Sequence, residues 1–287
     1  MDRTQLSPRT LGEAIGVSQS SLKRWADRGI LRVHRTAGGH RRIDRREALR
    51  FIREVGFTVV RPDLLGISTR DPDGTESTVE GAPPALALQR ALHEGDEAAA
   101  RALVLSLFAS GQPLAEVFDQ VFRPALAAIG ELWLDDPHGI AIEHRATDLC
   151  AQLVGDLRGR IESRDPRGVA IGAAPAGDPY LLPSAMIAAA VSAEGFRTVN
   201  FGPNFPLSGL AEAAVREKAT FVWVSISHAT RATSLREEIH NLRDRLLPAG
   251  IPVIVGGANH ARLGLTEGKA LRVGQSIGCV VEFSRTV

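Results

Sequence analysis

Residues 11–43 hold the side chains whose types and spacing best suit chemistry, namely contact with DNA phosphates and base edges. One set of polar side chains falls on a single face of the helix expected after Ser18, and a second set flanks the Gly38-Gly39 pair. The two groups are Ser20, Ser21, Lys23 and Arg24, and Arg35, His40, Arg41 and Arg42. A short helix that is hydroxylated at its start and basic behind it suits a DNA major groove. Cationic side chains around a tight turn suit the phosphates beside that groove.

Two short helices and a hairpin must position these side chains. Apolar spacing over 11–17 predicts a first helix that is broken at Gly16. Ser18 is the expected N-cap of the second helix, which ends at Gly29. The apolar face of that helix consists of Leu22, Trp25 and Ala26. Gly38-Gly39 predicts a tight turn between two short strands.

Charge is divided unevenly along the 287 residues. The whole chain carries +1, whereas residues 1–56 carry +7 and the remainder carries −6. A basic head on an acidic body is expected when one module alone faces nucleic acid. The alternative is a solvated basic surface on a small helical domain, but the turn, the hairpin and the charge together favour DNA binding.

Residues 7–54 resemble the winged helix-turn-helix of MerR-type transcriptional regulators, and the stretch RTAGGHRRI resembles the wing of that family. The resemblance implies that Lys23 and Arg24 lie on a recognition helix. It also implies that Arg35, His40, Arg41 and Arg42 contact double-stranded DNA from the wing. Typical members dimerise through one long helix after this head. That helix is missing here, because residues 45–54 make only a short helix before Val55-Gly56.

The remaining composition predicts a soluble, cytoplasmic chain of several domains. No run of 18 apolar residues or signal-peptide core occurs, so no membrane contact is expected. Cys150 and Cys279 lie far apart without a CxxC pair, which argues against a disulfide or zinc and favours buried packing. We expect a DNA-binding head at 1–56, a flexible linker at 57–85, a four-helix bundle at 86–163 and a sheet domain at 164–287.

The sheet domain alternates apolar strands with helices. GVAIGAAPA, RTVNFG, FVWVSIS and PVIVGG read as four strands with helices between them, which predicts a parallel, doubly wound, Rossmann-like sheet. Ligands of such sheets bind beyond the carboxyl ends of the strands. The candidate rim residues there are Asp178, Tyr180, Ser225, Ser227, His228, Gly256, Gly257 and His260. Ordinary strand-to-helix loops would also supply some of these residues.

A bundle followed by such a sheet resembles the cobalamin-binding module of methionine synthase-like proteins. It resembles even more the light-sensing MerR regulators of the CarH/LitR kind, which join that module to the same head. Trp133, followed after nine residues by Glu143-His144, matches the family motif that covers the upper face of the corrin. The spacing of the family's sheet motifs is also kept. There are 41 residues between Pro183 and Ser225, and 28 between Ser227 and Gly256.

The motifs that the family uses on the lower face of the corrin are changed in this sequence. Its Asp-x-His-x-x-Gly motif reads Asp178-Pro179-Tyr180-Leu181-Leu182-Pro183 here, and its Ser-x-Leu motif ends in Ser227. Tyr180 replaces the histidine that coordinates cobalt, and a phenol must first lose a proton with an ordinary pKa of about 10. Pro183 replaces the glycine that lets the cofactor's tail descend. Leu134 stands where the light-sensing members have a further histidine, so no ordinary cobalt ligation or photochemistry is expected.

Three alternatives remain for this module. It binds cobalamin without a protein ligand, or it binds another ligand such as a different tetrapyrrole, with His144, His228 or His260 as contacts. In the third alternative it binds nothing and serves oligomerisation or protein contacts. Structural roles also exist for these side chains: Trp133 as a bundle aromatic, Tyr180 as a space-filling group, and the histidines as hydrogen-bonded loop residues.

Together these features predict a sequence-specific transcriptional regulator, a repressor, that acts as a dimer or tetramer through its C-terminal domains. No catalytic residues are expected. A corrinoid-carrying methyltransferase subunit would need a cobalt ligand and no DNA head, and this sequence shows the opposite. Two further hypotheses are an adenosylcobalamin-dependent light-sensing repressor without the usual histidine, and a ligand-free antirepressor. In each case a ligand or partner shifts the population between arrangements that do or do not space two heads on DNA.

Overall fold

The computed structural model describes residues 5–36, 39–55, 61–65, 82–131, 138–161, 165–229 and 231–287. These residues divide into two compact units. The first unit consists of residues 1–113, 121–149 and 160–162, and the second of residues 114–120, 150–159 and 163–287. No helix in the described ranges is long and apolar enough to span a membrane.

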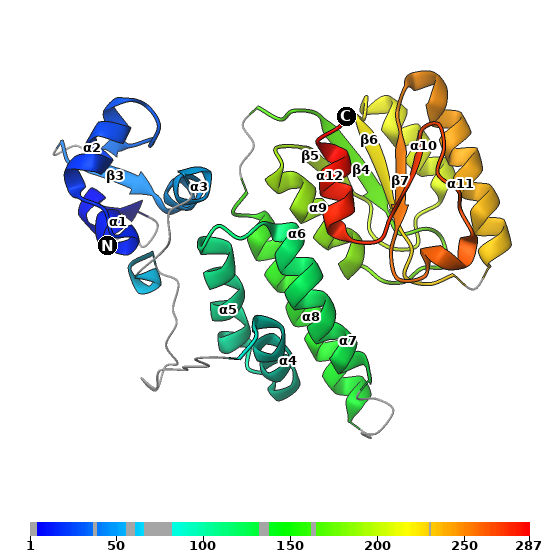
Figure 1. Cartoon of the computed structure of the whole chain (residues 1–287), viewed down its shortest axis with the longest axis horizontal. Helices are drawn as coiled ribbons and strands as arrows, with labels where there is room; N and C mark the ends of the chain where they lie inside the picture. The colour runs from blue at the N-terminus through cyan, green and yellow to red at the C-terminus, as the bar shows by residue number, and fades with distance from the viewer. Residues whose placement is uncertain are drawn as a thin grey trace. The chain divides into compact units, whose positions relative to one another are not determined.

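The first unit begins with a small mixed domain (Figure 1). Its helices are α1 (Pro8–Ile15), α2 (Gln19–Asp27) and α3 (Arg45–Val55), with a 3-10 turn at Pro62–Leu65. Its strands are β1 (Gln5–Leu6), β2 (His34–Arg35) and β3 (Arg41–Asp44), paired antiparallel in the order β1-β3-β2. β1 was not expected, because a two-residue strand has no period in the sequence.

Local signals account for α1 and α2 of this domain. The Ser7 hydroxyl caps α1 by accepting from the Thr10 backbone N–H, and Gly16 ends the helix with a left-handed φ of 68°. Ser18 caps α2 through the Ser21 N–H, so the predictions for Gly16 and Ser18 are confirmed. The predicted domain end at residue 56 falls short. Leu65 is buried and Arg61 N–H donates to the Ala14 carbonyl, so residues 61–65 pack on α1 rather than forming linker.

Helical segments follow between residues 84 and 158. They are α4 (Pro84–Glu94), α5 (Glu97–Ala109), α6 (Leu114–Val117), a π-helical turn (Phe118–Phe122), α7 (Arg123–Glu131) and α8 (Gly139–Arg158). In the first unit α4 packs against α5 and α7. α6 belongs to the second unit, and α8 runs through both. Four helical segments were expected here, and the third is interrupted by the π turn.

The second unit contains a parallel sheet with the strand order β5-β4-β6-β7-β8. The strands are β4 (Val169–Ala173), β5 (Arg197–Asn200), β6 (Phe221–Ser225), β7 (Val253–Gly256) and β8 (Leu271–Gly274). The helices are α9 (Leu182–Ala193), α10 (Leu207–Arg216), α11 (Ala232–Leu246) and α12 (Ile277–Ser284). Two 3-10 turns cover Leu247–Ala249 and His260–Leu263.

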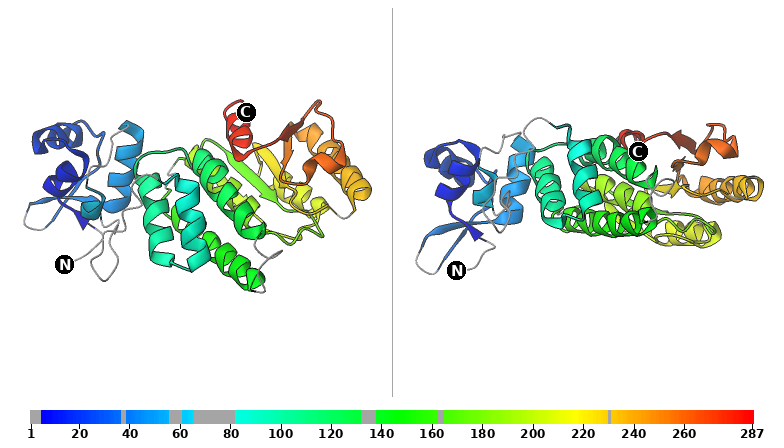
Figure 2. Two further views of the ribbon diagram at one scale, coloured as in Figure 1. Left: turned by 60° about the horizontal axis from the view of Figure 1, so that its bottom comes forward. Right: turned by 90° about the horizontal axis from the view of Figure 1, so that it is seen from below.

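Helices cover both faces of this sheet, as Figures 1 and 2 show. α9 and α12 lie on one face and α10 and α11 on the other, which confirms the predicted doubly wound architecture. β8 and α12 were not predicted. The α9–α12 face also contacts α6, and the carboxylate of Asp119 accepts the N–H groups of Ile277 (3.0 Å) and Gly278 (2.9 Å) at the start of α12.

Candidate functional site

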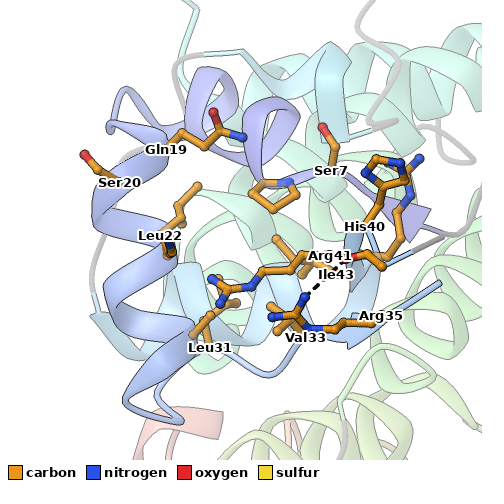
Figure 3. A pocket seen from close by; sticks show the side chains of 15 residues that line it. Ser7, Gln19, Ser20, Leu22, Leu31, Val33, Arg35, His40, Arg41 and Ile43 are labelled. Carbon is orange, nitrogen blue, oxygen red and sulfur yellow. Dashed lines mark hydrogen bonds between the residues drawn. The ribbon is translucent and has the colours of Figure 1, made fainter. Parts of the chain in front are cut away.

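A groove of about 790 Å³ lies between α2 and the β2–β3 hairpin (Figure 3). Gln19 and Ser20 come from α2 on one side, while Arg35, His40 and Arg41 come from the hairpin on the other. Among the eight predicted DNA contacts, those that line the groove are Ser20, Lys23, Arg35, His40, Arg41 and Arg42. Ser21 and Arg24 are not lining residues. The fold therefore gathers most of the predicted set around one cationic groove.

Hydroxyl groups organise the start of α2. The hydroxyl oxygens of Ser20 and Ser21 lie 2.8 and 3.0 Å from that of Ser18, which also caps the helix. Arg24 donates to the Ser21 hydroxyl at 3.3 Å, whereas Lys23 is exposed. Leu22 is buried and lines the floor of the groove. These contacts present a hydroxylated first turn followed by cationic side chains.

The hairpin divides its cations between two faces. Arg35 pairs with Arg41 across the strands, and Arg35 Nη1 donates to the Gly39 carbonyl at 3.3 Å. Arg41 Nη2 lies 2.6 Å from Asp27 Oδ1, and only 20% of the Arg41 side chain is exposed. Arg41 Nη1 is buried without a hydrogen-bond partner among the described residues. Because side chains alternate along a strand, Arg42 leaves β3 on the side opposite Arg41, although both residues border the groove.

α3 holds the loop that connects α2 to the hairpin. Glu47 accepts the Arg32 backbone N–H and Arg50 Nε, both at 2.8 Å, and Arg50 Nη2 donates to the Ile30 carbonyl at 3.0 Å. Burial alone would raise the pKa of Glu47, but the hydrogen bonds from Arg50 and from the Arg32 N–H outweigh it and lower the pKa. Glu47 therefore stays ionised at neutral pH and helps to fix the loop between α2 and β2.

The second candidate site lies at the carboxyl ends of the parallel strands. Strand order reverses between β4 and β6, since β5 lies on the other side of β4, and such switch points open the crevice where ligands bind. Asp178 spans this point. Its Oδ2 accepts the backbone N–H groups of Ser227 (2.6 Å) and His228 (2.9 Å), and its Oδ1 accepts that of Tyr180 (3.1 Å). The buried carboxylate thus ties the β4 loop to the β6 loop.

The predicted rim residues of β6 and β7 are also brought together. Asn259, which sequence reasoning did not single out, donates through Nδ2 to the Ser227 carbonyl at 2.5 Å. His260 Nδ1 lies 2.6 Å from the Gly257 carbonyl oxygen. A Cβ at Gly257 would lie 2.4 Å from the Ile226 oxygen, so this glycine permits close backbone packing. A Cβ at Gly256 would likewise lie 2.6 Å from the Gly274 oxygen.

Two rim side chains are left available for a ligand. Ser225 Oγ is buried at the end of β6 and has no hydrogen-bond partner among the described residues. Tyr180 is 48% exposed and neighbours the equally exposed Leu181 in the loop before α9. Each of these groups, a partnerless buried hydroxyl and an exposed aromatic ring, could contribute to holding a polar, partly planar molecule.

The remaining predicted ligand contacts lie apart from this rim in the sequence. Glu143 and His144 occupy the first turns of α8 in the first unit, where Glu143 is half-buried and His144 is exposed. Trp133 and Leu134 fall outside the described residues. The role of the Trp-x9-Glu-His set therefore stays a prediction.

Sequence reasoning missed a buried polar network behind the rim. Trp223 Nε1 donates to the Ser184 hydroxyl at 3.0 Å, and that hydroxyl donates to Asn200 Oδ1 at 2.8 Å. The Gly202 N–H also donates to Asn200 Oδ1, at 3.1 Å. Trp223 in an apolar strand was a visible signal, but its partners lie on α9 and β5 and only the fold brings them together.

Parts of this chain are similar to a known protein family and to known proteins. Residues 86–157 match the B12 binding domain family. The HTH-type transcriptional repressor CarH of Myxococcus xanthus is 25% identical over 263 residues, which cover 86% of each chain. The monomethylamine corrinoid protein of Methanosarcina barkeri has 17% identity and a TM-score of 0.54, over 69% of this chain and 94% of that one. The helices and parallel sheet therefore share the fold of a corrinoid protein.

Proposed function

We propose that this chain is a DNA-binding transcriptional repressor with a winged helix-turn-helix head controlled by a C-terminal module of the cobalamin-binding type. The observation that carries the proposal is the union, in one chain, of the cationic groove at 7–43 with a segment that matches the B12 binding domain. The similarity to a transcriptional repressor over most of both chains supports the same conclusion. A non-enzymatic role follows from this reading.

DNA binding by the head is supported by its shape and charge. α2 would enter a major groove with Lys23 exposed, while the hairpin would contact phosphates through Arg35, His40 and Arg42. The net charge of +7 within residues 1–56 would draw the head, rather than the acidic remainder, onto DNA.

The sheet rim does not fit a corrinoid whose cobalt is held from below by a protein imidazole. By its place in the sequence motif, Tyr180 would stand where the resemblance puts that imidazole; it is half exposed, and its backbone N–H donates to Asp178. A cobalamin has a cobalt-centred corrin ring as the group that would respond to light or ligand exchange. The residues that would meet such a ring from the sheet are Tyr180, Leu181 and Ser225, which can pack and hydrogen-bond without ligating cobalt.

Control of the head would follow from a shift in population. A ligand that prefers one arrangement of the two units would stabilise it by its difference in affinity for the two arrangements. In a dimer or tetramer, that arrangement would set the spacing of the heads on neighbouring half-sites. Loss of the ligand would release or restore repression through the same equilibrium.

The test combines DNA binding with ligand addition. The full chain is mixed in the dark with adenosylcobalamin, hydroxocobalamin or haem, and duplex DNA selected from a random pool reports affinity by fluorescence anisotropy. Size-exclusion chromatography and the visible spectrum are followed before and after illumination. We expect one of these ligands to change both DNA affinity and oligomeric state.

Three outcomes discriminate the alternatives. No affinity for any selected duplex would overturn the assignment of the head. Sequence-specific DNA binding that none of the ligands changes would replace ligand sensing with a protein-interaction or assembly role. A light-dependent change with adenosylcobalamin alone would identify a light sensor that works without the usual histidine.

A further inference from the structure

One face of β6 fills the layer between the sheet and α9. Val222, Val224 and Ile226 belong to the core shared with α10 and α11. Since side chains alternate along a strand, Trp223 and Ser225 point to the opposite face, toward α9 and α12. Trp223 is completely buried, and its indole N–H is satisfied by Ser184 in the first turn of α9.

The neighbouring strand is shaped to receive that indole. Gly172 of β4 stands beside Trp223 in the sheet register. A Cβ at Gly172 would lie 2.0 Å from ring atoms of Trp223, so the indole lies directly against the β4 backbone. The ring therefore lies between the β4 backbone and the hydroxyl of Ser184 and fills this part of the closely packed layer.

The route from the rim into this layer ends at the same ring. Ser225 is two residues beyond Trp223 on the same face and has the partnerless buried hydroxyl. Pro183 lies in the first turn of α9, beside Ser184, at the position where the resemblance places a descending cofactor tail. A tail that passed Ser225 and Pro183 would next meet the indole of Trp223.

We infer that this module accepts a corrinoid only with its nucleotide tail outside the sheet domain. The ligand class is then a cobalamin whose own benzimidazole base stays on cobalt, or a corrinoid that lacks the nucleotide. Indole and dimethylbenzimidazole are fused bicyclic rings of nearly the same size, so Trp223 occupies the volume that an inserted base would need. The inference rests on the proposed function, because it specifies how the ligand of that module is held.

The first experiment reads the state of the base directly. The full chain is titrated in the dark with adenosylcobalamin and with cobinamide, which has no nucleotide. We expect bound adenosylcobalamin to keep the absorption spectrum of its base-on form, and cobinamide to bind as well. A shift of the wild-type complex to the base-off spectrum would overturn the inference.

A second experiment needs no corrinoid. Trp223→Ala creates a cavity the size of the missing ring, and 5,6-dimethylbenzimidazole that fills it should raise the melting temperature in a concentration-dependent way. The wild type should show no such rise. Phe221→Ala is the matched control, because Phe221 is buried on the same face but one pleat farther from the rim. Trp223→Leu is a milder variant should the alanine protein fail to fold.

The results separate this inference from the proposed function. A rise in the wild-type melting temperature with dimethylbenzimidazole, or no rise in either Trp223 variant, would overturn the claim that Trp223 occupies the volume of an inserted base. If no corrinoid binds to any variant, the proposed ligand fails, while the melting data still decide whether Trp223 occupies the volume of the base. If Trp223→Ala binds adenosylcobalamin and shifts it to the base-off spectrum, the role of Trp223 is supported twice.

Discussion

The guanidinium of Arg41 and the carboxylate of Asp27 are 2.6 Å apart, and this ion pair joins the hairpin to the last residue of α2. Arg41 and Arg42 are adjacent and were predicted to act alike on DNA. The structure gives them different surroundings, because Arg41 is paired with Asp27 of α2, while Arg42 alternates to the other side of β3 and still borders the groove. Their variants should therefore differ.

Arg42→Ala should weaken DNA binding without changing stability. Loss of one phosphate contact is expected to reduce the slope of log affinity against log salt by about one. Arg41→Ala should lower the affinity and also destabilise the head by up to about 1 kcal/mol, the usual range for a partly exposed ion pair. Anisotropy titrations at several salt concentrations, with thermal melts, measure both effects. Arg216→Ala, a largely exposed arginine of the second unit, is the control. Equal salt slopes in the Arg42→Ala and wild-type proteins would contradict the wing assignment.

Glu47 should make the stability of the head depend on acidity. Its pKa is lower in the folded chain than the ordinary value of about 4.3, because Arg50 and the Arg32 N–H stabilise the carboxylate despite its burial. The stabilisation is therefore complete above the unfolded pKa and is lost as the pH falls through the folded pKa. Glu47→Gln should remove about 1–3 kcal/mol at neutral pH, the range for hydrogen bonds to a charged group.

Hydrogen exchange of α2 and α3 peptides in the full chain measures this local effect between pH 3 and 7. The wild type should lose protection as the pH falls through the lowered pKa of Glu47, while the protection of Glu47→Gln should be smaller at neutral pH and should change less with pH. Glu13→Gln is the control, because Glu13 is half exposed and its ion pair, with Arg9, lies within α1. Identical pH profiles for the wild type and Glu47→Gln would show that another group governs the acid sensitivity.

Most of the fold followed from local patterns because its signals are short-range. Ser18 and Gly16 act on backbone groups within four residues, so their roles could be inferred from the sequence. β8 escaped prediction because Leu271–Gly274 is a four-residue edge strand that includes the exposed Arg272. α12 is similarly short, and besides its local cap at Ser276 its first N–H groups are bound by Asp119, more than 150 residues away in the sequence.

The strand-end residues were expected to gather at one edge of the parallel sheet, and the strand order brings these loops to one edge, while their binding of a ligand stays a prediction. The contacts that each rim residue makes could not be predicted from the sequence. Asp178 was considered a ligand contact, yet its carboxylate is taken up by backbone N–H groups of a loop about 50 residues later. Trp223 and Gly172 show the same limit, since each has an ordinary place in an apolar strand until the register sets them side by side.

The two cysteines should differ sharply in reactivity. Burial raises the pKa of Cys150 to about 12, so almost no thiolate exists at pH 8, whereas Cys279 is partly exposed. A thiol reagent such as Ellman's reagent should titrate one thiol in the native chain and two after unfolding. Cys279→Ser should abolish the native reaction. Two fast thiols in the native wild type would contradict the packing of Cys150.

Asp178 supports the rim through three backbone N–H groups, and its replacement tests whether the rim is a working site. Asp178→Asn keeps one oxygen and turns an NH2 group toward at least one of those N–H donors, which should destabilise the second unit by about 1–3 kcal/mol. Denaturant unfolding of the full chain measures this loss, and the exposed Asp165→Asn is the control.

The same Asp178→Asn variant distinguishes two roles for the loops that Asp178 joins, namely ligand binding and stabilisation of the fold alone. If the β4 and β6 loops hold the ligand, their loosening should weaken hydroxocobalamin binding under conditions where the variant is still fully folded. Exchange protection of residues 226–229 should fall in parallel, because the Ser227 and His228 N–H groups depend on this carboxylate. Lower protection with unchanged ligand affinity would confine Asp178 to stability and move the binding site away from the switch point between β4 and β6.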